Sequence, residues 1–191
     1  MTAERDVALV ERFVGGDDAA FEELMTLHED RVFGICMRIM GNRDAAFDAL
    51  QETFLTLYRK ADRFKAEARF TTWLYRVTVN TCYDQLRKKK RHTTSSVPDG
   101  FDPADPHAGD EFLSVEMRPA VGEALAALPA EFRDAIVLFD LQDMALEDVA
   151  EILEVPVGTV KSRLYRGRRL LAEALGNLQP GSKHPTGENN E

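Results

Sequence analysis

One short stretch of this sequence places polar and basic side chains at the spacing of a single helix face. Between residues 157 and 171, Thr159, Ser162, Arg163 and Arg166 recur every three or four positions, and Lys161 lies among them. Hydroxyl and guanidinium groups near a helix N-terminus suit the major groove of DNA, where an arginine can donate two hydrogen bonds to guanine and a lysine can bind phosphate. The alternative is an ordinary solvated helix face.

A second set of side chains has the composition that binds unpaired bases. Cations, aromatic rings and one amide follow one another at intervals of 4, 3, 4, 3 and 4 residues: Arg69, Trp73, Arg76, Asn80, Tyr83 and Arg87. Rings stack on bases, guanidiniums bind the backbone, and the amide can pair with a base edge. Trp73 could equally be a core anchor. The basic run 87–91, which includes Lys88, fits either a solvated helix end or a phosphate contact.

A third set is acidic and polar. Asp48, Gln51 and Glu52 occupy positions i, i+3 and i+4 of a predicted helix. We place them opposite the stripe that we expect to be buried, which consists of Phe47, Leu50, Phe54 and Leu57. A solvated face explains this set, and so does a patch that docks a basic helix of a protein partner.

The residue types that usually perform catalysis are not grouped. Cys36 and Cys82 belong to no CxxC pair and have no histidine cluster near them, so two buried thiols are the favoured interpretation. The four histidines are scattered singly, and there is no Ser, His and Asp grouping and no glycine-rich phosphate loop. The sequence therefore predicts no enzyme, no cofactor and no metal site.

The elements that position these side chains are predicted to be helices, so the expected fold class is all-α. A helix that starts after Asp17 or Asp18 and stops at Gly41 should bury Phe21, Leu24, either Leu27 or His28, Val32, Ile35 and Ile39. The segment 145–175 divides into two amphipathic helices with a very short turn, and Pro156 fits the first position of the second helix. This is a helix-turn-helix pattern.

Charge and composition divide the chain, whose net charge is -9, into two domains. The stretch 92–116 has no Lys or Arg and contains Asp99, Asp102, Asp105, Asp110, Glu111 and Glu116. We predict helical domains over residues 1–91 and 112–178, a flexible acidic linker over 92–111 and a disordered tail over 179–191. The sequence shows neither a secretory signal nor a long apolar run, which predicts a cytoplasmic protein without membrane insertion.

Three segments together carry a resemblance to a known family. They are "FDALQETFLTLYRKADRF" (47–64), "FTTWLYRVTVNTCYDQLRKKKR" (70–91) and "ALAALPAEFRDAIVLFDLQDMALEDVAEILEVPVGTVKSRLYRGRRLL" (124–171), in that order and with the loose linker between the second and third. Over roughly residues 10–178 the chain resembles the extracytoplasmic-function (ECF) sigma factors of bacterial RNA polymerase, which belong to the sigma-70 family. The N-terminal part resembles sigma region 2, and the C-terminal part resembles sigma region 4.

The resemblance implies a role for each set of side chains. Asp48, Gln51 and Glu52 would bind the clamp helices of the polymerase large subunit, whose flap would be a second contact. The face from Trp73 to Arg87, with the loop 61–68, would melt and capture the -10 element through Arg69, Trp73, Arg76, Asn80, Arg87 and Lys88. Thr159, Lys161, Ser162, Arg163 and Arg166 would bind the -35 element as duplex DNA. The resemblance also implies control by an anti-sigma factor.

The chain departs from the pattern of this family at several positions. Phe47 stands where glutamate is typical, and Thr78 and Val79 stand where alanine and a basic residue are common. Glu154 occupies a usual glycine position, where a left-handed backbone would cost roughly 1 kcal/mol. Two alternatives stay open: a regulator that binds operator DNA without polymerase, and a scaffold or anti-sigma-like protein that needs no DNA.

Overall fold

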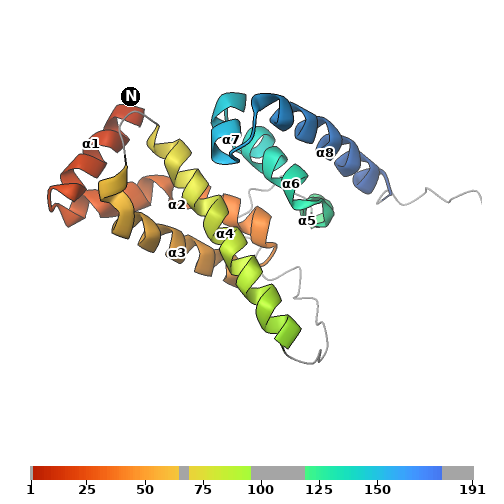
Figure 1. Ribbon diagram of the computed structural model, residues 1–191, viewed down its shortest axis with the longest axis horizontal. Helices are drawn as coiled ribbons and strands as arrows, with labels where there is room; N and C mark the ends of the chain where they lie inside the picture. Colours follow the sequence, from red (N-terminus) through yellow and green to blue (C-terminus); the bar gives the residue numbers. More distant parts are fainter. Residues whose placement is uncertain (1, 65–68, 96–118, 178–191) are drawn as a thin grey trace, which may run out of the picture.

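The computed structural model describes residues 2–64, 69–95 and 119–177, and the all-α fold class predicted from the sequence is confirmed (Figure 1). The N-terminal bundle consists of α1 (Thr2–Val14), α2 (Asp18–Met40), α3 (Arg43–Lys60), the short 3-10 helix η1 (Ala61–Arg63) and α4 (Phe70–Ser95). The C-terminal bundle consists of α5 (Pro119–Ala127), α6 (Ala130–Ile136), the π-helical segment η2 (Val137–Leu141), α7 (Leu146–Ile152) and α8 (Val157–Asn177). Among the helices of these ranges, none is long and apolar enough to cross a membrane.

The predicted domain limits fall largely outside the described residues. α4 continues to Ser95, into the range 92–111 predicted to be the linker. The rest of that range and the predicted tail from residue 179 lie outside the described ranges. The limits of the two domains therefore stay a prediction.

Local signals set the ends of α2 and the start of α3. Asp17 is the N-cap of α2, but its carboxylate accepts hydrogen bonds from Arg12 rather than from the helix, which holds the pKa of Asp17 below its usual value. Gly41 ends α2 in the left-handed conformation, with a φ of 66°, as the sequence predicts. The side chain of Asn42 then caps α3 by accepting a hydrogen bond from the backbone N–H of Ala45 at 3.0 Å.

The core of the N-terminal bundle contains His28 rather than Leu27, the two residues between which the sequence left the choice open. His28 of α2 is buried, whereas Leu27 is 41% exposed. His28 Nε2 lies 3.0 Å from Oδ1 of Asp6, which is also buried, so this polar contact joins α1 to α2. A buried histidine is acceptable here because it has a hydrogen-bonding partner.

The buried side of α3 differs from the predicted one. The buried residues of this helix are Ala46, Ala49, Thr53 and Leu57, whereas Phe47 is 39% exposed and Leu50 and Phe54 are half-buried. Small side chains let neighbouring helices approach closely, and the hydroxyl of Thr53 donates a hydrogen bond to the Ala49 carbonyl at 2.7 Å. The prediction that the large apolar residues are buried was wrong, except for Leu57.

The helix-turn-helix pattern is present as α7 and α8. Val149, Ala150 and Ile152 of α7 and Val160 and Leu164 of α8 are buried between them. Glu154 lies in the turn with a φ of 53°, the left-handed conformation expected for that position. Pro156 directly precedes α8, and its carbonyl accepts hydrogen bonds from the backbone N–H groups of Thr159 and Val160. Pro156 is thus the residue before the helix, whereas the sequence analysis placed it at the first position of the helix.

Gly167 allows α6 and α8 to cross closely. A Cβ atom at this position would lie 2.9 Å from Ile136 Cδ1 and 3.0 Å from Phe132 Cβ. Carbon atoms in ordinary contact are about 3.5–4.0 Å apart. A glycine is therefore needed where α8 passes over α6.

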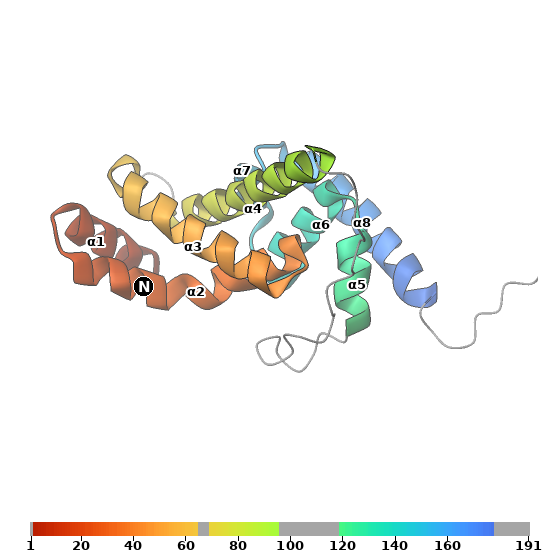
Figure 2. The same cartoon turned by 90° about the horizontal axis from the view of Figure 1, so that it is seen from below.

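The two bundles contact each other. α4 passes beside α7, and α2 contacts α5, α6 and η2 (Figures 1 and 2). The buried apolar residues of both bundles form one connected cluster. Two residues from different bundles, Tyr83 and Asp134, share a short hydrogen bond across this junction.

Candidate nucleic-acid interface

The exposed side of α8 carries most of the residues predicted to bind duplex DNA. Lys161, Ser162 and Arg166 are exposed, and Thr159 is half-buried. The hydroxyl of Ser162 donates a hydrogen bond to the Thr159 carbonyl at 2.8 Å, which fixes its position in the first turns of the helix. The geometry therefore leaves three polar side chains available on one outer face.

Arg163 lies on a different side of α8. It is half-buried, and its positive charge lowers the pKa of Asp134, a buried carboxyl group of α6. The charge of Arg163 therefore acts on a carboxyl group at the junction between the bundles. Its position agrees less well than those of Ser162 and Arg166 with a contact to a base edge.

Sequence reasoning missed Tyr165 on the same outer face. This side chain is 72% exposed, the highest value among the large hydrophobic residues that are exposed in the described ranges. It lies beside Arg166 in the sequence and one turn after Lys161, so it extends the polar face with an aromatic ring. An exposed aromatic residue within a basic helix was the signal that could have found it.

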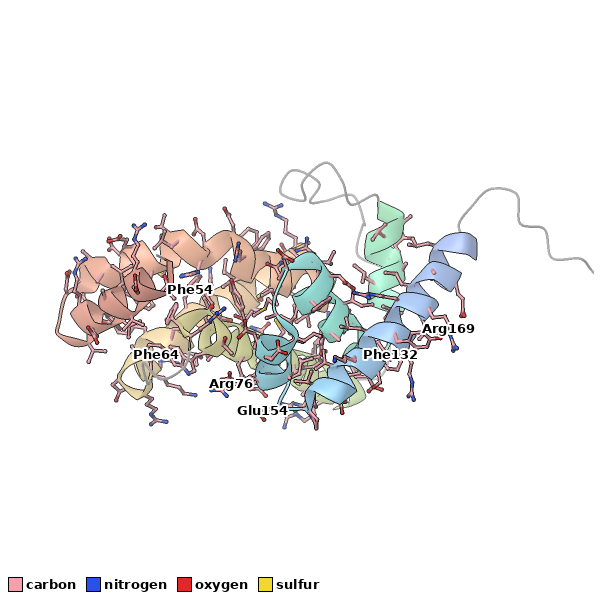
Figure 3. The ribbon with its side chains drawn as sticks, turned by 90° about the horizontal axis from the view of Figure 1, so that it is seen from above. Phe54, Phe64, Arg76, Phe132, Glu154 and Arg169 are labelled. Carbon is pink, nitrogen blue, oxygen red and sulfur yellow. The ribbon has the colours of Figure 1, made fainter. Side chains whose placement is uncertain are left out.

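The two arginines that follow have partners. Arg168 forms a forked ion pair with Asp140, and its guanidinium lies 5.6 Å from the centre of the Phe139 ring. Arg169 lies 3.5 Å from Glu173 and is labelled near the outer end of α8 in Figure 3. Arg168 therefore joins α8 to the end of η2, and its charge is less available than that of Arg166.

On α4, Trp73 belongs to an aromatic cluster. Its ring centre lies 5.5 Å from that of Phe64 and 6.0 Å from that of Phe70, and the side chain is half-buried. The ring is therefore anchored in the core on one side and accessible on the other. The loop that would complete this surface, residues 65–68, lies outside the described residues.

The other predicted residues of α4 differ in their surroundings. Asn80 and Lys88 are exposed, and Arg76 is half-buried. Arg87 lies 2.5 Å from Asp84, one turn earlier, in an exposed pair. In Figure 3, Arg76 lies on the part of α4 that is next to α7. The predicted residues of α4 thus differ in exposure and in their neighbours, and their common role stays a prediction.

The departures at residues 78 and 79 have a structural explanation. Thr78 is fully buried and donates a hydrogen bond from its hydroxyl to the Leu74 carbonyl at 2.9 Å. Val79 is also buried. Both therefore serve the core of the N-terminal bundle, and neither is available to bind phosphate.

A groove lies between α2 and α3, beside the residues predicted to bind a protein partner. Its volume is about 780 Å³, and it is lined by Asp18, Phe21, Glu22, Met25, Thr26, Glu29, Leu50, Gln51, Phe54, Leu55 and Tyr58. Leu55 and Tyr58 are 48% and 51% exposed. The floor is apolar and three acidic residues of α2 lie along it, so the groove suits an amphipathic basic helix.

Gln51 lines this groove together with Leu50 and Phe54, so it does not lie opposite them as predicted. Asp48 is exposed outside the lining, and Glu52 is half-buried, 4.0 Å from Arg59. The prediction was wrong because it assumed that Leu50 and Phe54 are buried. They are instead part of the same open surface.

Phe47 has a defined contact on this side of the bundle. Its ring centre lies 4.6 Å from that of Phe33, and the guanidinium of Arg43 lies 5.1 Å from the centre of the Phe47 ring. The stacked arginine covers an aromatic ring at the position where the resembling family typically has glutamate. An apolar and cationic cluster therefore replaces an acidic residue there.

The described residues offer no metal site, because no group of three or more His, Cys, Asp or Glu side chains in these ranges could hold an ion. Cys36 and Cys82 face each other with their sulfur atoms 3.8 Å apart, and both are completely buried. Contact with Cys82 and burial raise the pKa of the Cys36 thiol. Because both thiols are buried and the thiolate form is disfavoured, we interpret Cys36 and Cys82 as unreactive core residues.

Each bundle matches the model of a known protein family. The family model for sigma-70 region 2 matches residues 24–92, and the model for sigma-70 region 4 matches residues 118–171. Among curated proteins, the ECF RNA polymerase sigma factor SigM of Mycobacterium tuberculosis is 38% identical over 176 residues, covering 92% of this chain and 87% of the relative. SigW of Bacillus subtilis is 33% identical over 178 residues, covering 85% and 92%.

Among solved structures, the sigma factor RpoE of Bartonella quintana, in complex with the anti-sigma factor NepR, matches with a TM-score of 0.67 and 26% identity. The match covers 82% of this chain and 96% of that one. The structure of CnrH in complex with the cytosolic domain of CnrY also gives a TM-score of 0.67, at 23% identity, and covers 91% of this chain and 98% of that one. At that identity the second match supports the fold alone.

Proposed function

This chain belongs to the extracytoplasmic-function sigma factors of the sigma-70 family, and we propose that it binds promoter DNA with two separate helical faces. As a sigma factor it directs core RNA polymerase to promoters and initiates transcription. The N-terminal bundle would open and hold the -10 element, and the C-terminal bundle would recognise the -35 element. Because the two bundles belong to one chain, binding of one bundle to its element would raise the effective concentration of the other bundle at the second element.

The observation that carries this proposal is the outer face of α8. Ser162 and Arg166 are exposed on it with Lys161, and Tyr165 adds an exposed ring. We assign base contacts in the major groove to Ser162 and Arg166, and phosphate contact to Lys161. Thr159 would hold Ser162 in place through the hydrogen bond to its carbonyl. Arg163 would act mainly at the junction of the bundles.

On α4 we assign the capture of unpaired bases to Trp73 and Asn80, because one offers a ring and the other an exposed amide. Arg69, Arg76, Arg87 and Lys88 would bind the backbone of the separated strand. Arg69 directly precedes α4, the other three lie on that helix, and all but Arg76 are exposed.

We assign polymerase binding to the groove between α2 and α3. Gln51 contributes a polar group to its lining, and Leu50, Phe54, Leu55 and Tyr58 supply the apolar contact area. Asp48 and Glu52 would contribute charge at its edge. A basic, amphipathic helical segment of the polymerase clamp fits this chemistry, and a further contact with the flap would involve the C-terminal bundle.

The chain would act by binding alone, in the cytoplasm beside the polymerase, without a cofactor or a reaction of its own. An anti-sigma factor is a further proposed partner. Its support is the match to RpoE of Bartonella quintana, which was solved in complex with an anti-sigma factor.

The experiment is run-off transcription with core polymerase on promoters whose -10 and -35 elements are scrambled separately. We expect transcripts only when both elements and core polymerase are present, with the chain and the core co-eluting in size-exclusion chromatography. Binding of a duplex operator in the absence of polymerase, with no co-elution, would instead support a regulator that works alone and would contradict the proposal.

A further inference from the structure

The surface of the groove between α2 and α3 continues past the residues that line it. On α3, Phe47 precedes the lining residues Leu50 and Phe54 by three and seven positions, the spacing of one helix face. On α2, Phe33 follows the lining residue Glu29 by four positions. The ring centres of Phe33 and Phe47 are 4.6 Å apart, so the two side chains extend the same surface toward the turn that joins the helices.

An arginine covers this end of the surface. The guanidinium carbon of Arg43 lies 5.1 Å from the ring centre of Phe47 and 6.0 Å from that of Phe33, and we call these three residues the Arg43 cluster. Within the described ranges Arg43 forms no ion pair, although Asp44 and Asp48 are exposed nearby on α3. A guanidinium that stacks on rings keeps its planar N–H edge free, and that edge suits a carboxylate.

The rest of the groove is acidic. Three carboxylates of α2 line it, all of them exposed and none in an ion pair with another described residue: Asp18, Glu22 and Glu29. Asp17 and Glu23, which lie outside the lining, are instead paired with arginines of α1. The surface therefore has open negative charge along α2 and an open positive charge at the Arg43 cluster.

These charges lie at different positions along the groove. Arg43 and Tyr58, the last lining residue of α3, are 15 positions apart, which corresponds to about 22 Å of helix. An apolar floor by itself accepts a helix in either direction. A surface with opposite charges toward its two ends favours one direction, because the reversed helix would bring like charges together.

We propose that the groove and the Arg43 cluster form one polarised docking surface, which sets the direction of the polymerase helix bound there. This inference rests on the proposed function, which assigns polymerase binding to the groove. The polymerase helix would carry basic residues toward Asp18, Glu22 and Glu29 and an acidic residue toward Arg43. Phe47 would supply an apolar contact beside that acidic residue, since its side chain is 39% exposed.

The first test measures the affinity of the full-length chain for core RNA polymerase by fluorescence anisotropy. We expect Arg43→Gln to raise the dissociation constant about fivefold, the effect of one partly exposed ion pair. Arg43→Lys keeps the charge but not the planar N–H edge, so its loss should be smaller. Lys60→Gln removes the same charge at the other end of α3, where the side chain is exposed outside the groove lining, and should change the constant by less than about twofold. Circular dichroism checks that the variants keep their helices.

The same measurement separates this inference from the proposed function. Weaker binding by Arg43→Gln than by Lys60→Gln supports the polarised surface. Equal binding by these two variants, with binding by the wild type, would overturn the polarised surface and leave the proposed function standing. A wild-type chain that does not bind core polymerase would overturn both.

Site-specific cross-linking tests the direction of the bound helix. A benzophenone maleimide is attached to Asp44→Cys in one variant and to Leu55→Cys in another, and both variants keep the Arg43 cluster. Cys36 and Cys82 are completely buried, so the reagent labels the introduced thiol. The two labels are 11 positions apart on α3, about 16 Å. We expect both to react with one polymerase helix, the first beside an acidic residue and the second beside basic residues, as mass spectrometry of the cross-linked peptides would locate them.

The order of the cross-links decides the result. Cross-links in the opposite order, or beside basic residues at both positions, would contradict the proposed direction. Reaction of each label with both positions of the polymerase helix would show that the helix binds in either direction, which also contradicts the proposal.

Discussion

At the scale of single residues, basic side chains on one helix have different surroundings. Arg166 is exposed on the outer face of α8, Arg163 is half-buried and its charge acts on the buried Asp134, and Arg168 is held by Asp140. The three have the same chemistry, but a guanidinium that is already paired must lose that partner before it can bind a base. Exposure and pairing therefore decide which arginine is available for DNA.

We expect Arg166→Ala to reduce run-off transcription at promoters that depend on the -35 element by about tenfold to a hundredfold. The reason is the loss of base contacts that contribute about 1–3 kcal/mol. Arg168→Ala removes the same charge from the same helix and should change the yield by less than about threefold, because its partner is Asp140. Equal losses in the two variants would show that only the charge of α8 matters. Thermal unfolding of both variants checks that they remain folded.

At the scale of elements, the two functional helices are positioned in different ways. α8 is held by a close crossing with α6 at Gly167, where only a hydrogen atom fits against Phe132 and Ile136. α4 is anchored by buried residues and by the aromatic contacts of Trp73. A small shift of α8 against α6 would therefore move its whole outer face.

Gly167→Ala should lower the free energy of unfolding by about 1–3 kcal/mol, since the added methyl group overpacks the crossing of α6 and α8. Gly122→Ala is the matched control, because Gly122 lies within α5 and nothing surrounds its missing Cβ within 4 Å. That substitution should raise stability by about 0.5–1 kcal/mol through helix propensity. Urea unfolding measures both values. A neutral effect at Gly167 would mean that the helices cross less tightly than described.

At the scale of the whole molecule, the packing of the two bundles against each other should depend on pH through Asp134. Burial raises the pKa of this carboxyl group to about 6, against an ordinary value of 3.8. The hydrogen bond from Tyr83 acts in the opposite direction but does not cancel the effect of burial. Because separation of the bundles would return the group to water, the packed bundles hold this proton more tightly than separated bundles would.

The packing of the bundles should therefore become less stable as the pH rises from about 4 to about 6, and above that range it carries the full cost of the buried charge. Between pH 5 and pH 7 this predicts about a tenfold shift toward separated bundles. Small-angle scattering at both values measures it. Asp134→Asn, which keeps an acceptor for Tyr83 without the charge, should abolish the dependence. A variant that responds to pH as the wild type does would assign the effect to another group.

Much of this molecule is determined by local sequence. Gly41 ends α2, Asn42 caps α3, and the spacing from Arg69 to Arg87 predicts one face of α4, because caps and helical periodicity act between residues close along the chain. The left-handed Glu154 and the helix-turn-helix are likewise local. The same patterns are enough to identify the family.

Tertiary structure decided which of these surfaces are open. The sequence pattern alone places Leu50 and Phe54 inside, yet α3 buries Ala46, Ala49 and Thr53 instead. Nothing local indicates that Tyr83 meets Asp134, 51 residues later, or that the charge of Arg163 acts on the same carboxylate. Periodicity tells which residues share a face, but the partner of that face depends on packing between elements far apart in sequence. For this sigma factor, packing therefore decides which DNA-binding groups are free.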